Sequence, residues 1–322
     1  MSAAQTPPAY QADILGAGYE QATLHFPDDY EGPVTATLVR KKAPQSTQKA
    51  VLYIHGFIDY FFQTEMAEQF NQHGFDFYAL DLRKYGRSIL PHQKYYNVRN
   101  LAEYDAEITR ALEIIGAEQH NAVLLCGHST GGLTATLYAA HHPEHPLIKA
   151  LWLNSPFYDF NMHPLKRAFA LPHLSRLGKV FPNLQLPSEL NPWYTASIHK
   201  ALKGEWQFNL DWKKEAYPKV RLSFISAVFE AQKEIHRGVK IDVPVLVMHS
   251  HQTKNPRKWG KAAQSSDVIL SVKHIRKYAK KIRGDVTIAE IKNGLHDLVL
   301  SEKAARSSVY RQLFSWLSSK GL

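Results

Sequence analysis

Short apolar runs alternate with longer amphipathic stretches along most of the chain. Six apolar segments of five or six residues recur at 50–54, 75–80, 122–126, 148–153, 243–248 and 286–291. Runs this short and this apolar are typical of strands that are covered on both faces. Between them, apolar residues recur with helical spacing at 63–73, 98–115, 133–142 and 301–319. This alternation predicts an α/β protein with a mostly parallel sheet and helices on both faces.

The first two predicted strands have a different pattern. Residues 19–26 and 34–41 alternate between apolar and polar positions, and the segment PDDYEGP separates them. Such a pattern predicts an antiparallel hairpin at an edge of the sheet, which brings the expected number of strands to eight.

The alternation of predicted strands and helices is interrupted between residues 156 and 240. Thirteen aromatic residues lie in 157–240, among them Trp193 and Trp206, together with several prolines. A stretch of this length with no strand signal is too long for a bare loop. We therefore predict a core domain formed by 1–156 and 241–322, and a helical cap inserted at 157–240. The aromatic residues either form the core of the cap or line a site beneath it.

Charge changes this picture in one region. The chain has 39 basic and 29 acidic residues, a formal net charge of +10, and residues 251–283 contain ten Lys or Arg but a single acid, Asp267. This basic stretch is either a solvated surface or a positive rim that attracts anionic substrates and makes transient contact with lipid surfaces. It lacks the basic and aromatic alternation of a single-strand binding groove, so no nucleic-acid partner is predicted.

The remaining composition narrows the class of protein. Hydrophobic residues make up 44% of the chain, and no apolar run approaches the roughly 18 residues of a membrane-spanning helix. The single cysteine, Cys126, forms no internal disulfide, and no thiolate metal site is expected. The N-terminal residues lack the basic and apolar regions of a signal peptide, which predicts a cytoplasmic protein. The oligomeric state is left open.

The segment AVLLCGHSTGGLTATLYAAHH carries the strongest chemical signal. A predicted buried strand ends at Cys126, the turn Gly127-His128-Ser129-Thr130-Gly131 follows, and a helix begins at once. This is G-x-S-x-G in the strand–turn–helix setting of a nucleophile elbow, which raises the serine hydroxyl above the sheet at a helix N-terminus. Serine needs a general base, and His296 follows the last predicted strand, where loops at the carboxyl edge of a sheet meet.

These residues resemble the α/β-hydrolase fold, and within it the capped branch of monoacylglycerol lipases, lysophospholipases and serine aminopeptidases. The resemblance rests on His55-Gly56-Phe57, on the elbow, on His296 and on 81–88 (DLRKYGRS), where Lys84 replaces the first glycine of D-x-R-G-x-G-x-S. It implies an oxyanion hole formed by the backbone amides of Phe57 and Thr130. His55 is then a hydrogen-bonded imidazole that shapes its loop.

The acid of the triad is less clear from the sequence. The resemblance implies an aspartate soon after strand 243–248, but residues 249–254 (HSHQTK) contain no carboxylate. Asp267, before the next helical stretch, keeps the order Ser, Asp, His of this fold and resembles an acid displaced by an inserted loop. Asp159 and Asp285 remain alternatives, and Asp267 could instead cap the following helix.

The resemblance implies a serine hydrolase that cleaves carboxylic esters through an acyl-enzyme, with Ser129, His296 and Asp267 as the triad and with no metal or organic cofactor. A small-molecule ester is the expected substrate, and lipid-derived monoesters are candidates because an aromatic cap suits an acyl chain. The alternatives are an iminopeptidase-type peptidase, a thioesterase, a small-ester carboxylesterase and a non-catalytic binding protein on the same fold.

Overall fold

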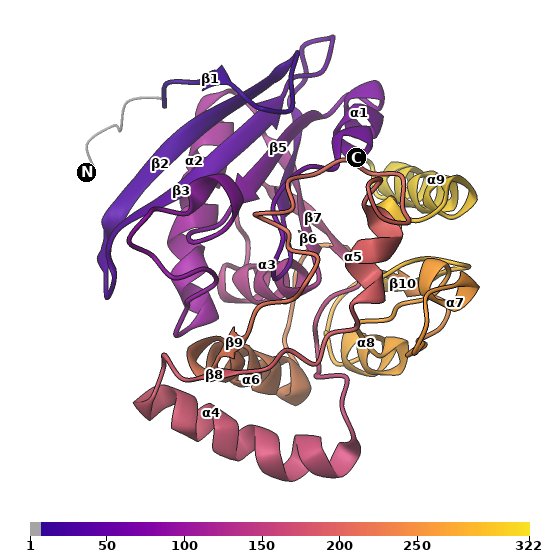
Figure 1. Cartoon of the computed structure of the whole chain (residues 1–322). Helices are drawn as coiled ribbons and strands as arrows, with labels where there is room; N and C mark the ends of the chain where they lie inside the picture. The colour runs from indigo at the N-terminus through magenta and orange to yellow at the C-terminus, as the bar shows by residue number, and fades with distance from the viewer. Residues whose placement is uncertain (1–7) are drawn as a thin grey trace.

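The computed structural model describes residues 8–322 and is built around a nine-stranded sheet (Figure 1). Strand β2 runs antiparallel to β1 and β3, and β3 runs antiparallel to β5. All other neighbouring strands of this sheet are parallel. The order across the sheet is β1-β2-β3-β5-β4-β6-β7-β10-β11. The strands are β1 (Gln11–Ala12), β2 (Tyr19–Asp29), β3 (Gly32–Lys41), β4 (Lys49–Ile54), β5 (Asp76–Asp81), β6 (Ala122–His128), β7 (Ile148–Asn154), β10 (Val245–Ser250) and β11 (Val286–Ile291).

Helices cover both faces of this sheet, because successive strand side chains point to opposite sides. Val51 of β4 packs in one apolar cluster with α1 and α9, and its neighbour Leu52 packs in another with α2, α3 and α8. The helices and short helical turns outside the 157–240 region are α1 (Thr64–Gln72), η1 (Gly86–Ser88), η2 (Leu101–Tyr104), α2 (Asp105–Ala117), α3 (Thr130–His141), α7 (Lys261–Gln264), α8 (Val272–Ala279), η4 (Leu298–Leu300) and α9 (Lys303–Ser319).

Of the segment between β7 and β10, α4 and α6 form a group at one end of the molecule, whereas α5 lies apart from them and packs against α7 (Figure 1). Helix α6 packs against both α4 and α3, so it connects this group to the rest of the molecule. The elements of the segment are η3 (Lys166–Ala170, a π-helical turn), α4 (Leu171–Val180), β8 (Gln185–Leu186), α5 (Trp193–Ile198), β9 (Val220–Arg221) and α6 (Leu222–Arg237). The division into core and cap stays a prediction.

The predicted fold class is confirmed, with two corrections in detail. The sheet has nine strands and not eight, because the two-residue β1 pairs with β2 and forms the edge in place of the predicted hairpin. The 157–240 region, predicted without strands, contains the two-residue strands β8 and β9 as a small antiparallel pair. Strands of two residues have no alternation that a sequence pattern could show. No helix within the described residues is long and apolar enough to cross a membrane.

Candidate active site

Ser129 occupies a strained turn between β6 and α3. Its φ of 53° and ψ of −116° lie outside the regions that non-glycine residues usually adopt. Added Cβ atoms at Gly127 and Gly131 would lie 2.3 Å from backbone oxygens, so neither position admits a side chain without a shift of the backbone. The two glycines of the motif therefore act as predicted, since they allow β6, the serine and α3 to meet in one tight turn.

The structure brings Ser129, His296 and Asp267 together in a chain of hydrogen bonds. His296 Nε2 lies 3.0 Å from Ser129 Oγ, and His296 Nδ1 lies 2.9 Å from Asp267 Oδ2. All three residues are buried. With Nδ1–H donating to the carboxylate, Nε2 is free to accept the serine proton.

Asp267 reaches His296 because the chain after β10 makes an excursion and returns. Asp267 pairs with Thr253 in a parallel bridge, and backbone hydrogen bonds join its N–H to the Gln252 carbonyl and its carbonyl to the Lys254 N–H. The loop 254–266 therefore begins and ends at the same place, directly after β10. The second carboxylate oxygen, Oδ1, accepts the N–H groups of Ile269 and Leu270 at 2.8 and 2.7 Å, so it also holds the turn before α8.

The two alternative acids lie elsewhere. Asp159 is buried, and its Oδ2 forms an ion pair with Arg167 Nη1 at 3.1 Å. The same oxygen lies 3.6 Å from His274 Nδ1. Asp285 is exposed and pairs with Lys320 at 2.5 Å. Neither carboxylate contacts His296 within the described residues, so the geometry favours Asp267 as the partner of this imidazole.

The two amides predicted for the oxyanion hole flank the serine. Thr130 is the first residue of α3, where a backbone N–H has no partner within the helix. A Cβ on Gly56 would lie 3.1 Å from the Ser129 Cβ, so the loop that carries Phe57 passes directly beside the serine. In residues 8–322, neither N–H donates a hydrogen bond, and both residues line the pocket at Ser129.

His55 holds the loop that carries Phe57. The Leu82 N–H donates to its Nε2 at 3.1 Å, so Nδ1 carries the proton and donates to the Gly56 carbonyl at 2.7 Å. Burial lowers the pKa of His55, which keeps the ring neutral. These contacts match the structural role predicted for this histidine.

A pocket opens over Ser129 and His296. The 157–240 region and the rest of the chain both contribute to its walls, which are mainly apolar. The lining residues are Phe57, Ile58, Asp59, His128, Ser129, Thr130, Phe157, Leu190, Tyr194, Thr195, Lys213, Tyr217, Ile269, Leu270 and His296. Trp193 and Trp206, which the sequence offered as lining candidates, are absent from this set, and the Trp206 indole donates to the Leu300 carbonyl at 2.9 Å.

A buried ion pair lies in the pocket wall, and sequence reasoning missed it. Lys213 Nζ is 2.8 Å from Asp59 Oδ1, and their side chains are only 4% and 1% exposed. The second oxygen of Asp59, Oδ2, is buried and has no hydrogen-bond partner within residues 8–322. The only sequence signal was the position of Asp59, two residues after His-Gly-Phe.

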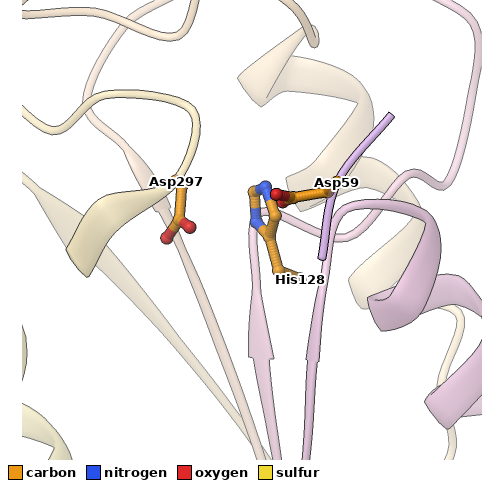
Figure 2. Close-up of side chains that lie close together, drawn as sticks. All are labelled: Asp59, His128 and Asp297. Atoms are coloured by element: carbon orange, nitrogen blue, oxygen red, sulfur yellow. The ribbon is translucent and has the colours of Figure 1, made fainter. Parts of the chain in front are cut away.

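Asp59 also belongs to a buried cluster with His128 and Asp297, in which the His128 ring lies between the two carboxylates (Figure 2). One nitrogen or oxygen from each residue lies within 4.8 Å of the others, a spacing that could hold a metal ion. The donors around them argue against that use, because Lys213 already pairs with Asp59, and Asn154 and Gln63 donate amide hydrogens to the two oxygens of Asp297.

The His128 ring fits the same interpretation of a hydrogen-bonded polar cluster. Its Nδ1 lies 3.2 Å from the Asn154 carbonyl, to which it donates. Burial lowers the pKa of His128 to about 4, although the Asp297 carboxylate acts in the opposite direction. The ring is therefore neutral near pH 7 and adds no positive charge beside Ser129.

The protein family described as serine aminopeptidase, S33, matches residues 45–303 of this chain. Among curated proteins, the AB hydrolase superfamily protein YisY of Bacillus subtilis is 25% identical over 222 residues, which cover 64% of this chain and 75% of that protein.

Two solved structures of lipases share the fold. The monoacylglycerol lipase of Paleococcus ferrophilus aligns with a TM-score of 0.64 and 22% identity over 88% of this chain and 99% of its own. A soluble variant of the monoglyceride lipase of Saccharomyces cerevisiae aligns with a TM-score of 0.66 and 16% identity over 92% of this chain and 94% of its own. At these identities the similarity is one of fold.

Proposed function

The chain belongs to the serine aminopeptidase S33 family, and from this premise we propose that it is a serine hydrolase that cleaves carboxylic esters through an acyl-enzyme. The observation that carries the proposal is the hydrogen-bonded chain from Asp267 through His296 to Ser129 on the floor of a mainly apolar pocket.

The proposed reaction has two halves. Ser129 Oγ attacks the ester carbonyl while His296 Nε2 takes its proton, and Asp267 holds the ring and stabilises the imidazolium. The negative charge on the carbonyl oxygen faces the N–H groups of Phe57 and Thr130, each worth about 3 kcal/mol of transition-state stabilisation at such a site. His296 returns the proton to the leaving alcohol, and a water activated by the same nitrogen then cleaves the acyl-enzyme.

The pocket supports a lipid-derived or similarly apolar ester. Leu190, Tyr217, Ile269 and Leu270 offer apolar surface to an acyl chain, and two of the fold relatives are lipases of monoglycerides. A monoacylglycerol lipase-like or lysophospholipase-like activity is the first candidate, followed by a carboxylesterase of broader range. In this proposal residues 157–240 are the cap that shapes the acyl site.

A peptidase that holds a free amino terminus is the second candidate, because the family description names aminopeptidases. Such an enzyme needs a carboxylate for the substrate's ammonium group. Asp59 is the one acid among the described lining residues, and Lys213 already compensates its charge. The pair therefore favours a neutral ester, and a thioester would be accepted by the same chemistry.

The test combines a covalent probe with a substrate panel. A fluorophosphonate should label the wild-type protein, and Ser129→Ala should lose labelling and ester hydrolysis together. The panel compares p-nitrophenyl esters of graded acyl length with a monoacylglycerol, a lysophospholipid, an acyl thioester and an aminoacyl amide. Full labelling of Ser129→Ala would disprove the assignment of the nucleophile, and faster cleavage of the amide than of all esters would favour the peptidase.

A further inference from the structure

A second pocket opens where the inserted segment meets the start of α9. One wall is formed by Ser197 of α5 and by the turn 203–205 that follows this helix, and the other by Leu300 and by residues 302–303. The two walls are held together, because the Trp206 indole donates to the Leu300 carbonyl at 2.9 Å. None of these residues takes part in the reaction proposed above, so the pocket needs a separate explanation.

The hydroxyl of Ser197 has no partner. Ser197 is only 7% exposed, and its Oγ forms no hydrogen bond within residues 8–322. A serine or threonine in a helix can satisfy its hydroxyl by donating to the carbonyl four residues earlier, as Thr134 and Thr136 of α3 do. Leaving a buried hydroxyl unpaired is unfavourable. Since Ser197 lines the second pocket, a ligand there would supply the missing partner.

The start of α9 supplies two further donors. In the part of the chain that the structure describes, the N–H groups of Lys303 and Ala304 donate no hydrogen bond, and the side chain of Glu302 does not cap the helix. Helix α9 extends over 17 residues, so its N-terminal end carries the partial positive charge of a long helix. Together with the Ser197 hydroxyl, these N–H groups suit the oxygen atoms of an anion.

The charged side chains of the lining leave a positive excess. Lys203 and Lys303 are exposed, and among the described residues no carboxylate lies within 4 Å of either ammonium group. Of the two acids in the lining, Glu205 is neutralised by an ion pair with Arg306. Glu302 forms no ion pair in the described structure. Two unpaired cations therefore face one unpaired carboxylate, which favours a ligand of negative charge.

We propose that this second pocket binds a small oxyanion, the carboxylate or phosphate group of a metabolite, and that the bound group stabilises α5 over the catalytic pocket. Its oxygen atoms accept hydrogen bonds from the Ser197 hydroxyl and from the first N–H groups of α9. Lys203 and Lys303 add charge-assisted hydrogen bonds from the two sides of the pocket.

Helix α5 connects the second pocket with the catalytic one. Tyr194 and Thr195 of this helix line the pocket at Ser129, and the Tyr194 ring packs edge-on against the His296 ring with centroids 5.5 Å apart. Leu295, the residue before His296, lines the second pocket. A ligand that bridges α5 and α9 favours the arrangement in which Tyr194 lies against His296. This coupling, unlike the binding itself, rests on the proposed function.

The experiment is a calorimetric titration of the full chain at constant ionic strength. The titrants are inorganic phosphate, acetate and, as an uncharged comparison, glycerol. One phosphate or one acetate per chain should bind, and glycerol should not. Phosphate binding without acetate binding would identify the phosphate group as the ligand chemistry, and the reverse would identify the carboxylate.

Substitutions in the lining assign the binding to this pocket. Lys203→Gln/Lys303→Gln should weaken it about tenfold or more, because two hydrogen bonds from charged donors are lost. Ser197→Ala should weaken it about fivefold. Glu302→Gln should tighten it about threefold, because the variant removes the one unpaired carboxylate beside the anion.

The matched control for the double lysine variant is Lys200→Gln/Lys219→Gln. It removes two exposed lysines of the inserted segment that lie outside the pocket lining, so it should bind phosphate like the wild type. Thermal unfolding without phosphate checks that each variant keeps the fold.

The coupling has its own readout. Saturating phosphate should speed fluorophosphonate labelling of Ser129 about fivefold in the wild type and leave Lys203→Gln/Lys303→Gln unchanged. The titration needs no catalytic activity, so a chain that binds phosphate but is not labelled would contradict the proposed function and not the binding site.

Two results would overturn the proposal. The first is a phosphate or acetate affinity that is equal in the wild type and in Lys203→Gln/Lys303→Gln, since the anion would then bind elsewhere. The second is a wild-type protein that binds neither phosphate nor acetate. A labelling rate that does not change when phosphate is bound would refute the coupling through α5.

Discussion

The turn at Ser129 and the segment 157–240 build one pocket by different physical means. Around the turn, every residue from 123 to 139 is buried, and backbone atoms leave no room for side chains at Gly127 and Gly131. The inserted segment has an exposed apolar face on α4, and it contacts the rest of the protein through apolar side chains of α6, such as Phe224 and Val228, and through ion pairs such as Lys213 with Asp59. The first region leaves no space for added side chains at its two glycines, whereas the second exposes part of its surface.

Under the proposed function, this difference assigns chemistry to the first region and selectivity to the second. Ser129, Thr130 and His296 come from the sheet and its loops, whereas Leu190, Tyr194, Lys213 and Tyr217 come from the inserted segment. Close packing tolerates little change, since most buried substitutions create cavities or strain. Substitutions around the triad should therefore affect turnover, and those in the inserted segment should affect substrate preference and the free energy of unfolding.

The largest effect is expected from Asp267→Asn. The variant should lower turnover about 10⁴-fold on every ester, because an amide no longer holds the His296 tautomer in which Nε2 accepts a proton. Steady-state kinetics on a p-nitrophenyl ester measures the effect. Asp285→Asn, at the exposed alternative acid, is the control and should match the wild type. Asp159→Asn should also cost far less than Asp267→Asn, and the opposite ranking would assign the acid to the residue after β7.

A smaller effect, on stability, is expected where the two regions meet. Lys213→Met leaves the Asp59 carboxylate buried without its cation, which should lower the free energy of unfolding by about 3–5 kcal/mol. Asp59→Asn/Lys213→Met removes both charges and should recover most of the loss. Urea unfolding of the wild type, both single variants and the double variant gives the coupling energy. A double variant no more stable than Lys213→Met would show that the lysine acts through packing alone.

The buried His128 should make stability depend on pH. Its pKa is about 4 in the folded chain against an ordinary value of 6.5. As the pH falls from 6.5 to 4, the unfolded chain binds a proton that the folded chain excludes, so the free energy of unfolding decreases. The maximum decrease from this residue is about 3 kcal/mol. His128→Asn, which keeps a side-chain N–H toward the Asn154 carbonyl, should lose this part of the dependence in urea unfolding at several pH values. An unchanged slope would mean that His128 titrates normally in the folded protein.

The smallest effect is expected on acyl preference. Leu190 lines the pocket, so Leu190→Ala should shift the ratio of rates on long and short esters about tenfold while fluorophosphonate labelling stays intact. Trp206→Ala is the matched control, because its indole contacts the Leu300 carbonyl and lies outside the pocket lining. Equal shifts in both variants would indicate a general loosening of the inserted segment.

The same contrast explains what the sequence could predict. The longer strands, the fold class and the turn at Ser129 follow from local patterns, because a buried strand and G-x-S-x-G each consist of consecutive residues. The sequence analysis named Ser129 and His296, with Asp267 as the first of three candidate acids, and the structure places these three side chains in one chain of hydrogen bonds.

Non-local features were not predictable in this way. Asp59 and Lys213 are far apart in the chain, and no pattern marks a lysine that becomes buried against a distant carboxylate. The aromatic content of the inserted segment suggested Trp193 and Trp206 as lining residues, but the pocket uses Tyr194, Leu190 and Tyr217. Which side chains of the inserted segment face the site depends on tertiary packing, and composition does not encode it.

The bridge between Thr253 and Asp267 has a consequence for how this chain can be altered. Because the loop 254–266 leaves and rejoins the fold at neighbouring residues, its length is uncoupled from the position of the Asp267 carboxylate. The loop also contacts the inserted segment, because α7 packs against α5 and the Asn191 amide donates to Asn255 Oδ1 and to the Pro256 carbonyl, so an insertion or a grafted reporter belongs at the exposed residues 257–258. A longer or shorter loop would leave the acid at the same anchor, so the number of residues after β10 does not locate it.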